Sequence, residues 1–254
     1  MTNPVKLLKR DNLKIEIYKD EKLMGQAAAD FTASRLSKAI AERGMANLIL
    51  ATGTSQFAFL EALKEKDIDW GKITVFHLDE YIGISEDHPA SFRKYLKERI
   101  LNIVKPGKVY LINADTPELQ DMMSGYEKLL KENPVDIACI GIGENGHIAF
   151  NDPPVADFND PLWVKDVELD HACRVQQLEE GWFPSLDKVP ERAVTLTVTA
   201  IMNSRAISCV VPGKRKIKAV NDTLNAPVNE KCPATILRRH HDATLFLDLV
   251  SGGQ

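Results

Sequence analysis

The chain has 254 residues, of which 44% are hydrophobic and 27% are charged, and its net charge is −4. A nucleic-acid-binding protein usually carries a basic stripe, and no run of five or more like charges occurs here, so nucleic acid is not an expected partner. The amino-terminal stretch MTNPVKLLKRDNLKIE lacks the apolar core of a signal peptide, and no apolar run is long enough for a membrane span. We therefore expect a cytoplasmic protein with no membrane partner.

Short apolar, β-branched segments alternate along the chain with longer amphipathic segments, which predicts strands and helices in turn. Uninterrupted apolar runs such as ILAT and IACIGI favour strands that helices cover on both faces. We expect a single α/β domain over residues 1–254, with a doubly wound, mostly parallel, Rossmann-like sheet flanked by helices. The predicted strands are 14–18, 47–52, 73–78, 108–113, 136–142, 193–198, 206–211 and 243–249. The predicted helices are 22–43, 56–66, 90–103, 116–132 and 214–224.

The segment 152–190 interrupts this alternation with prolines, acidic residues and two tryptophans. A long irregular segment in a compact domain is usually a lid or a binding loop, and a surface excursion without a role is the alternative. Doubly wound sheets bind ligands at the carboxyl ends of their strands. The side chains that follow the predicted strands are therefore the first candidates for a site, with 152–190 as its lid.

Two turns at predicted strand ends have the composition of an anion site. Thr52-Gly53-Thr54-Ser55 leads into a predicted helix, whose free N–H groups and dipole favour a phosphate. Lys216 lies in the basic stretch that follows a Pro-Gly turn and opens another predicted helix, where an anion would offset the positive charge. An ordinary capped helix and a solvated basic face would explain the same residues. The turn at 52–55 lacks the lysine and spacing of a P-loop and the pattern of a dinucleotide fingerprint, so no nucleotide cofactor is expected.

Two further elements suit proton transfer. Asp79 and Glu80 follow the predicted strand 73–78, and adjacent side chains point in opposite directions, so one of them can face a ligand. A carboxylate there is a natural general base for a carbon-bound proton, although an Asp-Glu pair can also cap a helix. In GIGENGHIAFNDP, the glycines let the backbone approach a ligand closely. His147 follows them, and the carboxylate of Asp152 could fix the tautomer of its imidazole.

Metal chemistry has little support in the sequence. Cys139, Cys173, Cys209 and Cys232 are scattered, form no C-x-x-C pair, and are read as reduced cysteines packed as small hydrophobes. The adjacent pair His240-His241 would point in opposite directions on a strand, which does not suit zinc. The motifs together predict a phosphorylated small molecule handled by proton transfer, without a metal.

The segments LATGTS, LDEYIGIS, GIGENGHIAFNDP, AVTLT, VVPGKRK and CPATIL resemble glucosamine-6-phosphate deaminases, and the resemblance covers roughly residues 45–250. It implies conversion of glucosamine 6-phosphate and water into fructose 6-phosphate and ammonia, with a phosphorylated amino sugar as substrate and no cofactor. It assigns Asp79 as the base that shuttles a proton between C2 and C1, and His147 as the catalyst of ring opening. It also assigns the phosphate to the turn at 52–55 and to Lys216.

This chain departs from the family pattern at three places. Asp152 replaces the glutamate that usually supports the histidine, and Asn145 stands where members have aspartate or asparagine, so that it can orient but not titrate. The substrate-binding arginine of the family aligns with Gly181. Arg174 is a candidate replacement, and Gln176 or Gln177 could contact hydroxyl groups. The identity of the sugar is therefore open.

Other readings remain. The related 6-phosphogluconolactonases share the fold and a glycine-histidine turn, but typically continue with threonine and serine where this chain has IAFN. A lactonase or an isomerase of another sugar phosphate is the second hypothesis, and a non-catalytic sugar-phosphate sensor is the third. The residues of the allosteric site of some hexameric members do not align, so we expect unregulated activity. The sequence leaves the oligomeric state open.

Overall fold

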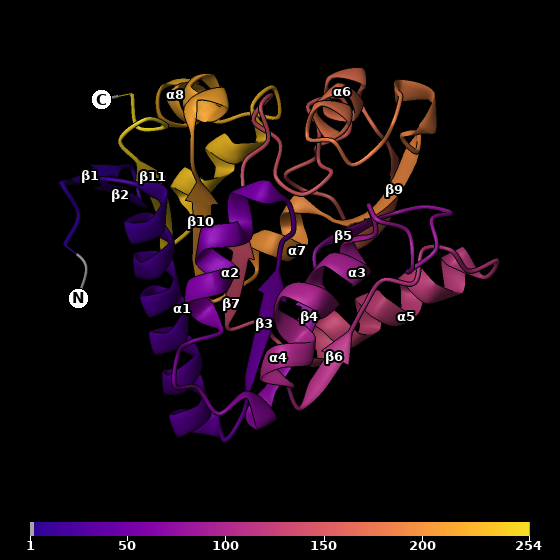
Figure 1. The fold of residues 1–254 in the computed structure, drawn as a ribbon, viewed down its shortest axis with the longest axis horizontal. Coiled ribbons are helices and arrows are strands. Elements are labelled where there is room, and N and C mark those ends of the chain that lie inside the picture. Colours follow the sequence, from indigo (N-terminus) through magenta and orange to yellow (C-terminus); the bar gives the residue numbers. More distant parts are fainter. Residues whose placement is uncertain (1–2, 254) are drawn as a thin grey trace.

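The computed structural model describes residues 3–253, and its strands form a main sheet and a smaller one (Figure 1). The main sheet has eight strands in the order β1-β2-β11-β10-β7-β3-β4-β6, and every neighbouring pair is parallel except the edge pair β1–β2. Its strands are β1 (Lys6–Arg10), β2 (Leu13–Tyr18), β3 (Ala46–Leu50), β4 (Ile73–His77), β6 (Lys108–Tyr110), β7 (Ile137–Ile140), β10 (Ile207–Val211) and β11 (Ala243–Asp248).

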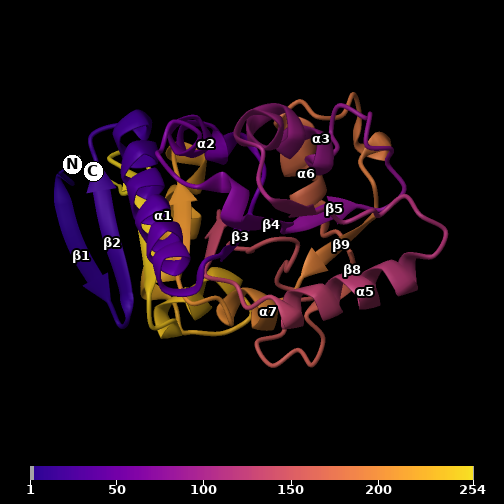
Figure 2. The same cartoon turned by 90° about the horizontal axis from the view of Figure 1, so that it is seen from below.

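Helices cover both faces of this sheet, as the apolar runs predicted (Figure 2). On one face lie α1 (Glu21–Arg43), α2 (Phe57–Leu63) and α3 (Phe92–Leu96), the last continued by a π turn and α4 (Asn102–Val104). The other face carries α5 (Leu119–Glu132), α7 (Val198–Met202) and α8 (Ile217–Asn225), which share a second apolar core. The expected doubly wound architecture is confirmed. Within residues 3–253, none of the helices has the length and apolarity that crossing a membrane requires.

The strand order reverses between β3 and β7. After β3 the chain builds β4 and β6 on one side, then returns across β3 to build β7, β10 and β11 on the other. The loops that leave β3 and β7 therefore diverge in opposite directions. Ligands of open α/β sheets bind in the crevice that such a reversal leaves at the carboxyl ends of the strands.

The predicted strand at 193–198 forms as β9 (Arg192–Leu196), but it does not join the main sheet. It pairs antiparallel with β5 (Asp79–Tyr81) and β8 (Val164–Glu168) in a three-stranded sheet of order β5-β9-β8. Because β5 follows directly from β4, the chain passes from one sheet into the other at Leu78. The strand ending that was predicted to present Asp79 is therefore a junction between two sheets.

The segment 152–190 contains β8, helix α6 (His171–Glu179) and a short 3₁₀ turn at Leu186–Lys188. Helix α6 was not predicted. It packs on an aromatic cluster of the smaller sheet, in which Tyr81 contacts Phe92, Phe150 and Phe183 at ring-centroid distances of 4.9, 5.3 and 5.5 Å. This third apolar core fixes α6 beside the carboxyl ends of the main strands.

Candidate active site

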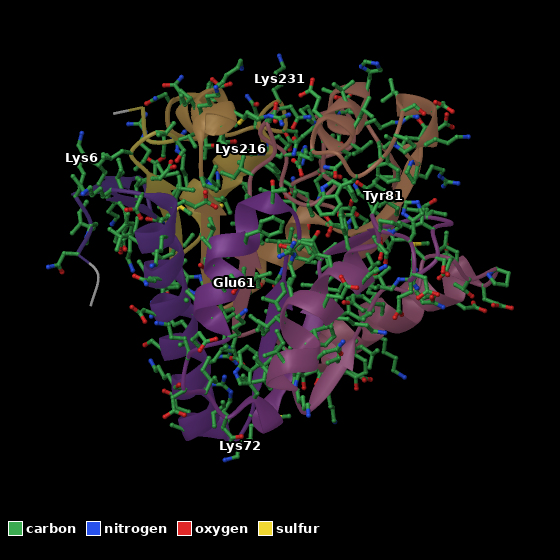
Figure 3. The ribbon with its side chains drawn as sticks, in the orientation of Figure 1. Lys6, Glu61, Lys72, Tyr81, Lys216 and Lys231 are labelled. Carbon is green, nitrogen blue, oxygen red and sulfur yellow. The ribbon has the colours of Figure 1, made fainter. Side chains whose placement is uncertain are left out.

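A cleft opens at the carboxyl ends of β3, β4, β7 and β10, and α6 contributes one wall. Figure 3 shows Lys216 at this end of the sheet and Lys72, which precedes β4, at the opposite end. The side chains and backbone that line the cleft belong to residues 51–55, Leu78, Asp79, Phe92, 141–143, His147, Ala149, Phe150, Gln176, Gln177, Glu180 and Lys216.

The turn at 52–55 lies in the lining, where a phosphate loop was predicted. Gly53 has a φ of +101°, which favours glycine, and its carbonyl accepts a hydrogen bond of 2.8 Å from the Tyr95 hydroxyl. Gln56 Nε2 donates to Ser55 Oγ at 3.0 Å and to the carbonyl of Val210 at 3.4 Å. Since Ser55 Oγ accepts from Gln56, its own proton is free to point at an anion in the cleft.

Lys216 supplies the positive charge of the cleft. It follows Gly213, whose φ of +83° shapes the turn after β10 and whose N–H donates to Asp248 at 3.1 Å. Lys216 is 9% exposed, and within residues 3–253 no carboxylate lies within ion-pair distance of its ammonium. Burial lowers the pKa of Lys216, an effect that the carboxylates of Glu180 and Glu144 partly oppose. A buried ammonium without a direct counter-ion is well suited to bind an anion.

Asp79 and Glu80 point to opposite sides of β5, as predicted. Glu80 is fully buried and accepts hydrogen bonds from Ser91 Oγ at 3.0 Å and from the backbone N–H of Arg93 at 3.0 Å, so it fixes the start of α3. Asp79 faces the cleft and is 6% exposed. Glu80 is therefore the acid that caps a helix, and Asp79 is the acid that is placed to face a ligand.

The environment of Asp79 suits a proton acceptor that works near neutral pH. Burial raises the pKa of Asp79 from its ordinary value of 3.8 to about 8, and the nearby Glu80 carboxylate adds to the shift. A general base is most effective when its pKa lies near the working pH, because a stronger base then remains sufficiently deprotonated. The apolar walls around β5 thus make this carboxylate a much stronger base than a solvated one.

The glycine-rich turn places the imidazole of His147 against its own backbone. A Cβ on Gly143 would lie only 2.2 Å from His147 Nε2, so residue 143 must be glycine for the ring to occupy this place. Gly146 has a φ of +87°, and its Cα faces Cys232 so closely that an added Cβ would lie 2.6 Å from Sγ. Gly143 therefore leaves room for the His147 ring, and Gly146 leaves room for the Cys232 thiol.

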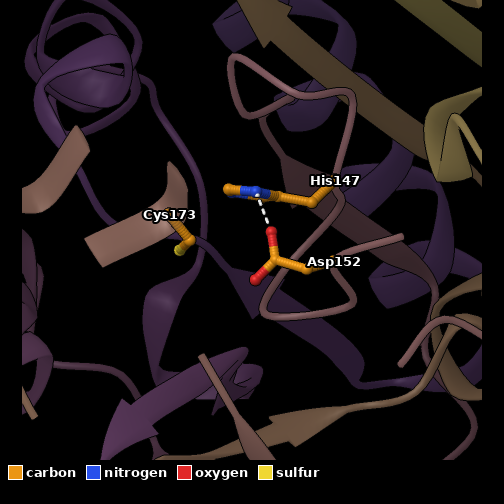
Figure 4. Close-up of side chains that lie close together, drawn as sticks. All are labelled: His147, Asp152 and Cys173. Carbon is orange, nitrogen blue, oxygen red and sulfur yellow. Dashed lines mark ion pairs between the residues drawn. The ribbon is translucent and has the colours of Figure 1, made fainter. Parts of the chain in front are cut away.

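Asp152 lies behind the imidazole, away from the cleft lining. Its Oδ1 is 2.8 Å from His147 Nδ1 and lies to one side of the ring in Figure 4, as an ion-pair contact rather than an in-plane hydrogen bond. The shorter aspartate thus reaches the histidine directly. Burial alone would raise the pKa of Asp152, but His147 and the amide of Asn145 together hold it below its ordinary value.

Asn145 orients this pair. Its Nδ2 donates to Asp152 Oδ1 at 2.8 Å, and its Oδ1 accepts the backbone N–H of His147 at 3.0 Å. Asn145 therefore spans the turn between the carboxylate and the histidine backbone. This arrangement suits an orienting role for Asn145, whose amide cannot act as an acid.

Arg174 does not line the cleft. Its Nη2 donates to the carbonyls of Leu186 and Val189 at 2.9 and 3.0 Å, so the guanidinium ties α6 to the following loop. The structure thus does not place Arg174 as the replacement for the missing family arginine. Gln176 and Gln177, one turn further along α6, do face the cleft.

The sequence did not single out Glu180, which also lines the cleft. Its carboxylate accepts hydrogen bonds from Gln176 Nε2 at 2.8 Å and from Trp182 Nε1 at 3.3 Å. It follows the end of α6 and immediately precedes Gly181, the residue that aligns with the family arginine. A carboxylate thus stands beside the position to which the family resemblance assigns a substrate-binding arginine.

Known proteins resemble this chain over most of its length. The family model of glucosamine-6-phosphate isomerases and 6-phosphogluconolactonases matches residues 19–246. The chain belongs to this family. Within it, the glucosamine-6-phosphate deaminase of Streptococcus gordonii is 31% identical over 236 residues, which are 93% of this chain and 96% of that protein. The corresponding protein of Oenococcus oeni is 30% identical over the same shares of the two chains.

Solved structures share the fold of this chain. A structure described as a monomeric glucosamine-6-phosphate deaminase is 30% identical, superposes with a TM-score of 0.86, and covers 94% of this chain and 98% of its own. A 6-phosphogluconolactonase from Shewanella baltica is 20% identical, superposes with a TM-score of 0.77, and covers 96% of this chain and 100% of its own. The second likeness shows that this family member shares the fold of the lactonases.

Proposed function

We propose that this chain is a glucosamine-6-phosphate deaminase, which converts glucosamine 6-phosphate and water into fructose 6-phosphate and ammonia. The observation that carries the proposal is that Asp79 and His147 face one cleft together with the turn at 52–55 and Lys216. A phosphate held by this turn and Lys216 would leave the sugar between the carboxylate and the imidazole. The deaminases among the relatives support the choice of an amino sugar.

Ring opening is the step that His147 would catalyse. The pyranose opens when the C1 hydroxyl loses a proton and the ring oxygen gains one, and an imidazole can perform both transfers. Asp152 and Asn145 would hold the ring in place for this step, because both contact the histidine from the side away from the cleft. The product is the open-chain aldehyde.

Asp79 would then remove the proton from C2 of the aldehyde, and the electron pair would move to give an enolamine. Returning the proton to C1 converts the enolamine into an imine at C2. Water adds to this imine, and the C2–N bond breaks to release ammonia and fructose 6-phosphate. A carboxylate whose pKa burial raises to about 8 is strong enough to take the carbon-bound proton and weak enough to return it.

Replacing Lys216 with methionine is expected to raise KM for glucosamine 6-phosphate by about 10- to 100-fold, the usual cost of one hydrogen bond to a charged group. The change in kcat should be small, because the phosphate is remote from the reacting carbons. Lys218→Met is the matched control, since the side chain of Lys218 is 83% exposed and pairs with Asp222. An unchanged KM in Lys216→Met would show that the phosphate binds elsewhere.

Glu180→Gln is expected to lower KM for glucosamine 6-phosphate by a few fold. The carboxylate lies in the cleft with Lys216, so it repels the phosphate dianion, and glutamine keeps the shape while removing the charge. Glu179→Gln serves as the control, because Glu179 is 58% exposed and pairs with Arg215 outside the cleft. A higher KM in Glu180→Gln would instead indicate that the carboxylate binds the substrate.

Gly143→Ala is expected to abolish most of the activity without unfolding the protein. The new methyl group would overlap the His147 ring, whose atoms lie 2.2–2.4 Å from the position that the alanine Cβ would take, so the imidazole must leave its place. Gly125→Ala in α5 is the control, since nothing lies within 4 Å of its Cβ position. Circular dichroism and steady-state kinetics of both variants test the expectation, and full activity of Gly143→Ala would contradict it.

The purified protein should be assayed in parallel with glucosamine 6-phosphate and 6-phosphogluconolactone. The proposal predicts ammonia and fructose 6-phosphate in equal amounts from the first substrate and no hydrolysis of the second. Lactone hydrolysis alone would make the chain a lactonase. Thermal stabilisation by glucosamine 6-phosphate without any turnover would make it a sugar-phosphate sensor.

A further inference from the structure

Helix α6 brings a third ligating side chain to the catalytic pair. His147, Asp152 and Cys173 each offer a ligand atom, and these atoms all lie within 4.8 Å of one another. Figure 4 shows the thiol of Cys173 to one side of the His147–Asp152 pair, facing both the imidazole and the carboxylate. Asp152 and Cys173 are each 1% exposed and do not line the cleft. The three side chains therefore form a buried cluster behind the active-site histidine.

We propose that this cluster is a binding site for a zinc-like divalent cation, and that occupation of the site switches the enzyme off. One nitrogen, one oxygen and one sulfur ligand form a set that zinc accepts and that magnesium and calcium do not. The cation is an inhibitor in this proposal and takes no part in the reaction.

The cluster has polar atoms to offer. Asp152 Oδ2 is buried without a hydrogen-bond partner among the described residues, and His147 Nδ1 makes no hydrogen bond there beside its ion-pair contact with Asp152 Oδ1. A buried polar atom without a partner costs free energy, and a cation could be bound by both of these atoms at once. The proton of the Cys173 thiol would leave to solvent on binding, so that thiolate and carboxylate together balance the two positive charges of the ion.

Small side-chain movements suffice to close the cluster around an ion. Zinc bond lengths of about 2.0–2.3 Å in a tetrahedron place ligand atoms roughly 3.3–3.6 Å apart. The present separations reach at most 4.8 Å, so the widest must shorten by about 1 Å. Three protein ligands would leave the fourth position to water.

Occupation of the site would prevent His147 and Asp152 from catalysing ring opening. The cation would take the Nδ1 lone pair of His147 and the carboxylate of Asp152, so that the imidazole could no longer exchange its proton with the sugar. The cleft itself would stay open, because Asp152 and Cys173 lie outside its lining. Zinc is therefore expected to lower kcat more than it raises KM.

The test uses the whole protein after removal of metals with a chelating resin. Cobalt(II) is added as the spectroscopic probe and zinc as the inhibitor, with binding followed by calorimetry. The wild type is expected to show the near-ultraviolet charge-transfer band of a thiolate–cobalt bond, and to lose about 10-fold or more of its turnover with zinc. Cys173→Ala and Cys173→Ser should lack the band. They should bind zinc about 100-fold more weakly, because mutating even a residue that only supports a metal ligand can weaken metal binding by that factor.

Cys232→Ala is the matched control, because the Cys232 thiol packs on Gly146 of the same turn but is not part of the cluster. It should keep both the cobalt band and the inhibition by zinc, each measured against its own metal-free activity. Wild-type protein that gives neither a band nor heat of zinc binding would overturn the proposal. So would undiminished zinc binding in both Cys173 variants. Because the band is read without any substrate, these outcomes do not depend on the proposed reaction.

Discussion

Asp79→Asn is expected to lower kcat for glucosamine 6-phosphate by about 10³-fold, within the 10²- to 10⁴-fold range of general acid–base catalysis. Asparagine fills the same space but cannot accept a proton from C2. KM should change little, since the phosphate contacts are elsewhere. The substitution removes the only acidic side chain of β5 that lines the cleft. Steady-state kinetics with coupled detection of ammonia measure the effect.

Asp79→Asn should also change how the free energy of unfolding depends on pH, an effect that can be measured separately from activity. Burial raises the pKa of Asp79 to about 8, so the folded protein holds this proton more tightly than the unfolded chain does. The resulting stability is fully present below about pH 4 and is lost as the pH rises through about 8. The free energy of unfolding of Asp79→Asn should therefore decrease less than that of the wild type between pH 5 and pH 9.

A suitable control is Asp187→Asn, because the Asp187 side chain is 72% exposed in the segment after α6. It should leave both kcat and the pH dependence of stability unchanged. Near-wild-type turnover by Asp79→Asn would remove Asp79 from the mechanism, whatever its effect on stability.

His147→Gln is expected to lower kcat by about 10²- to 10³-fold, because ring opening would lose its proton carrier. Asp152→Asn should cost about 10²-fold, since the amide cannot support the imidazole as the carboxylate does. The two residues contact each other at 2.8 Å and would act as a unit. The double variant should therefore be little slower than His147→Gln alone.

His171→Gln provides the control for this series, because His171 is exposed at the start of α6. Effects of His147→Gln and Asp152→Asn that multiply in the double variant would contradict a shared role. They would indicate instead that Asp152 supports the fold of the turn independently of the histidine.

Much of the main sheet could be predicted because its strands are buried on both faces. Runs such as ILAT and IACI carry no charged side chain on either face of the strand, which identifies them as buried strands. β3 and β7 form where they were expected. β1 and β5 were not assigned. β1 is an edge strand exposed on both faces, and β5 consists of the three residues DEY, whose composition resembles a turn. The strand conformation of β5 depends on pairing with β9, which is distant in sequence, whereas β1 pairs with the adjacent β2.

The candidate site was largely predictable for a related reason. Asp79, His147 and Lys216 all follow predicted strands, and parallel strands deliver their carboxyl ends to one edge of the sheet. The opposite directions of the two carboxylates were also accessible, because Asp79 and Glu80 are adjacent on an extended backbone. Strand periodicity therefore indicated that only one of the two acids could face the cleft, without deciding which.

The wall formed by α6 could not be predicted in the same way. Which side of this helix faces the cleft depends on its packing against Tyr81 and Phe183, which lie outside the helix in sequence. That packing turns Arg174 toward the carbonyls of Leu186 and Val189 and turns Glu180 inward. It also brings Cys173 to the catalytic pair, which a search for spaced ligand motifs does not reveal.

Glucosamine 6-phosphate labelled with deuterium at C2 offers the most direct test of the mechanism. If the single carboxylate of Asp79 carries the proton from C2 to C1, some of the deuterium must appear at C1 of the first fructose 6-phosphate formed, and the label must slow the reaction. Mass spectrometry of early time points measures both. Fructose 6-phosphate that carries no deuterium at C1 even at the earliest times, formed at a rate that the label does not affect, would contradict the account.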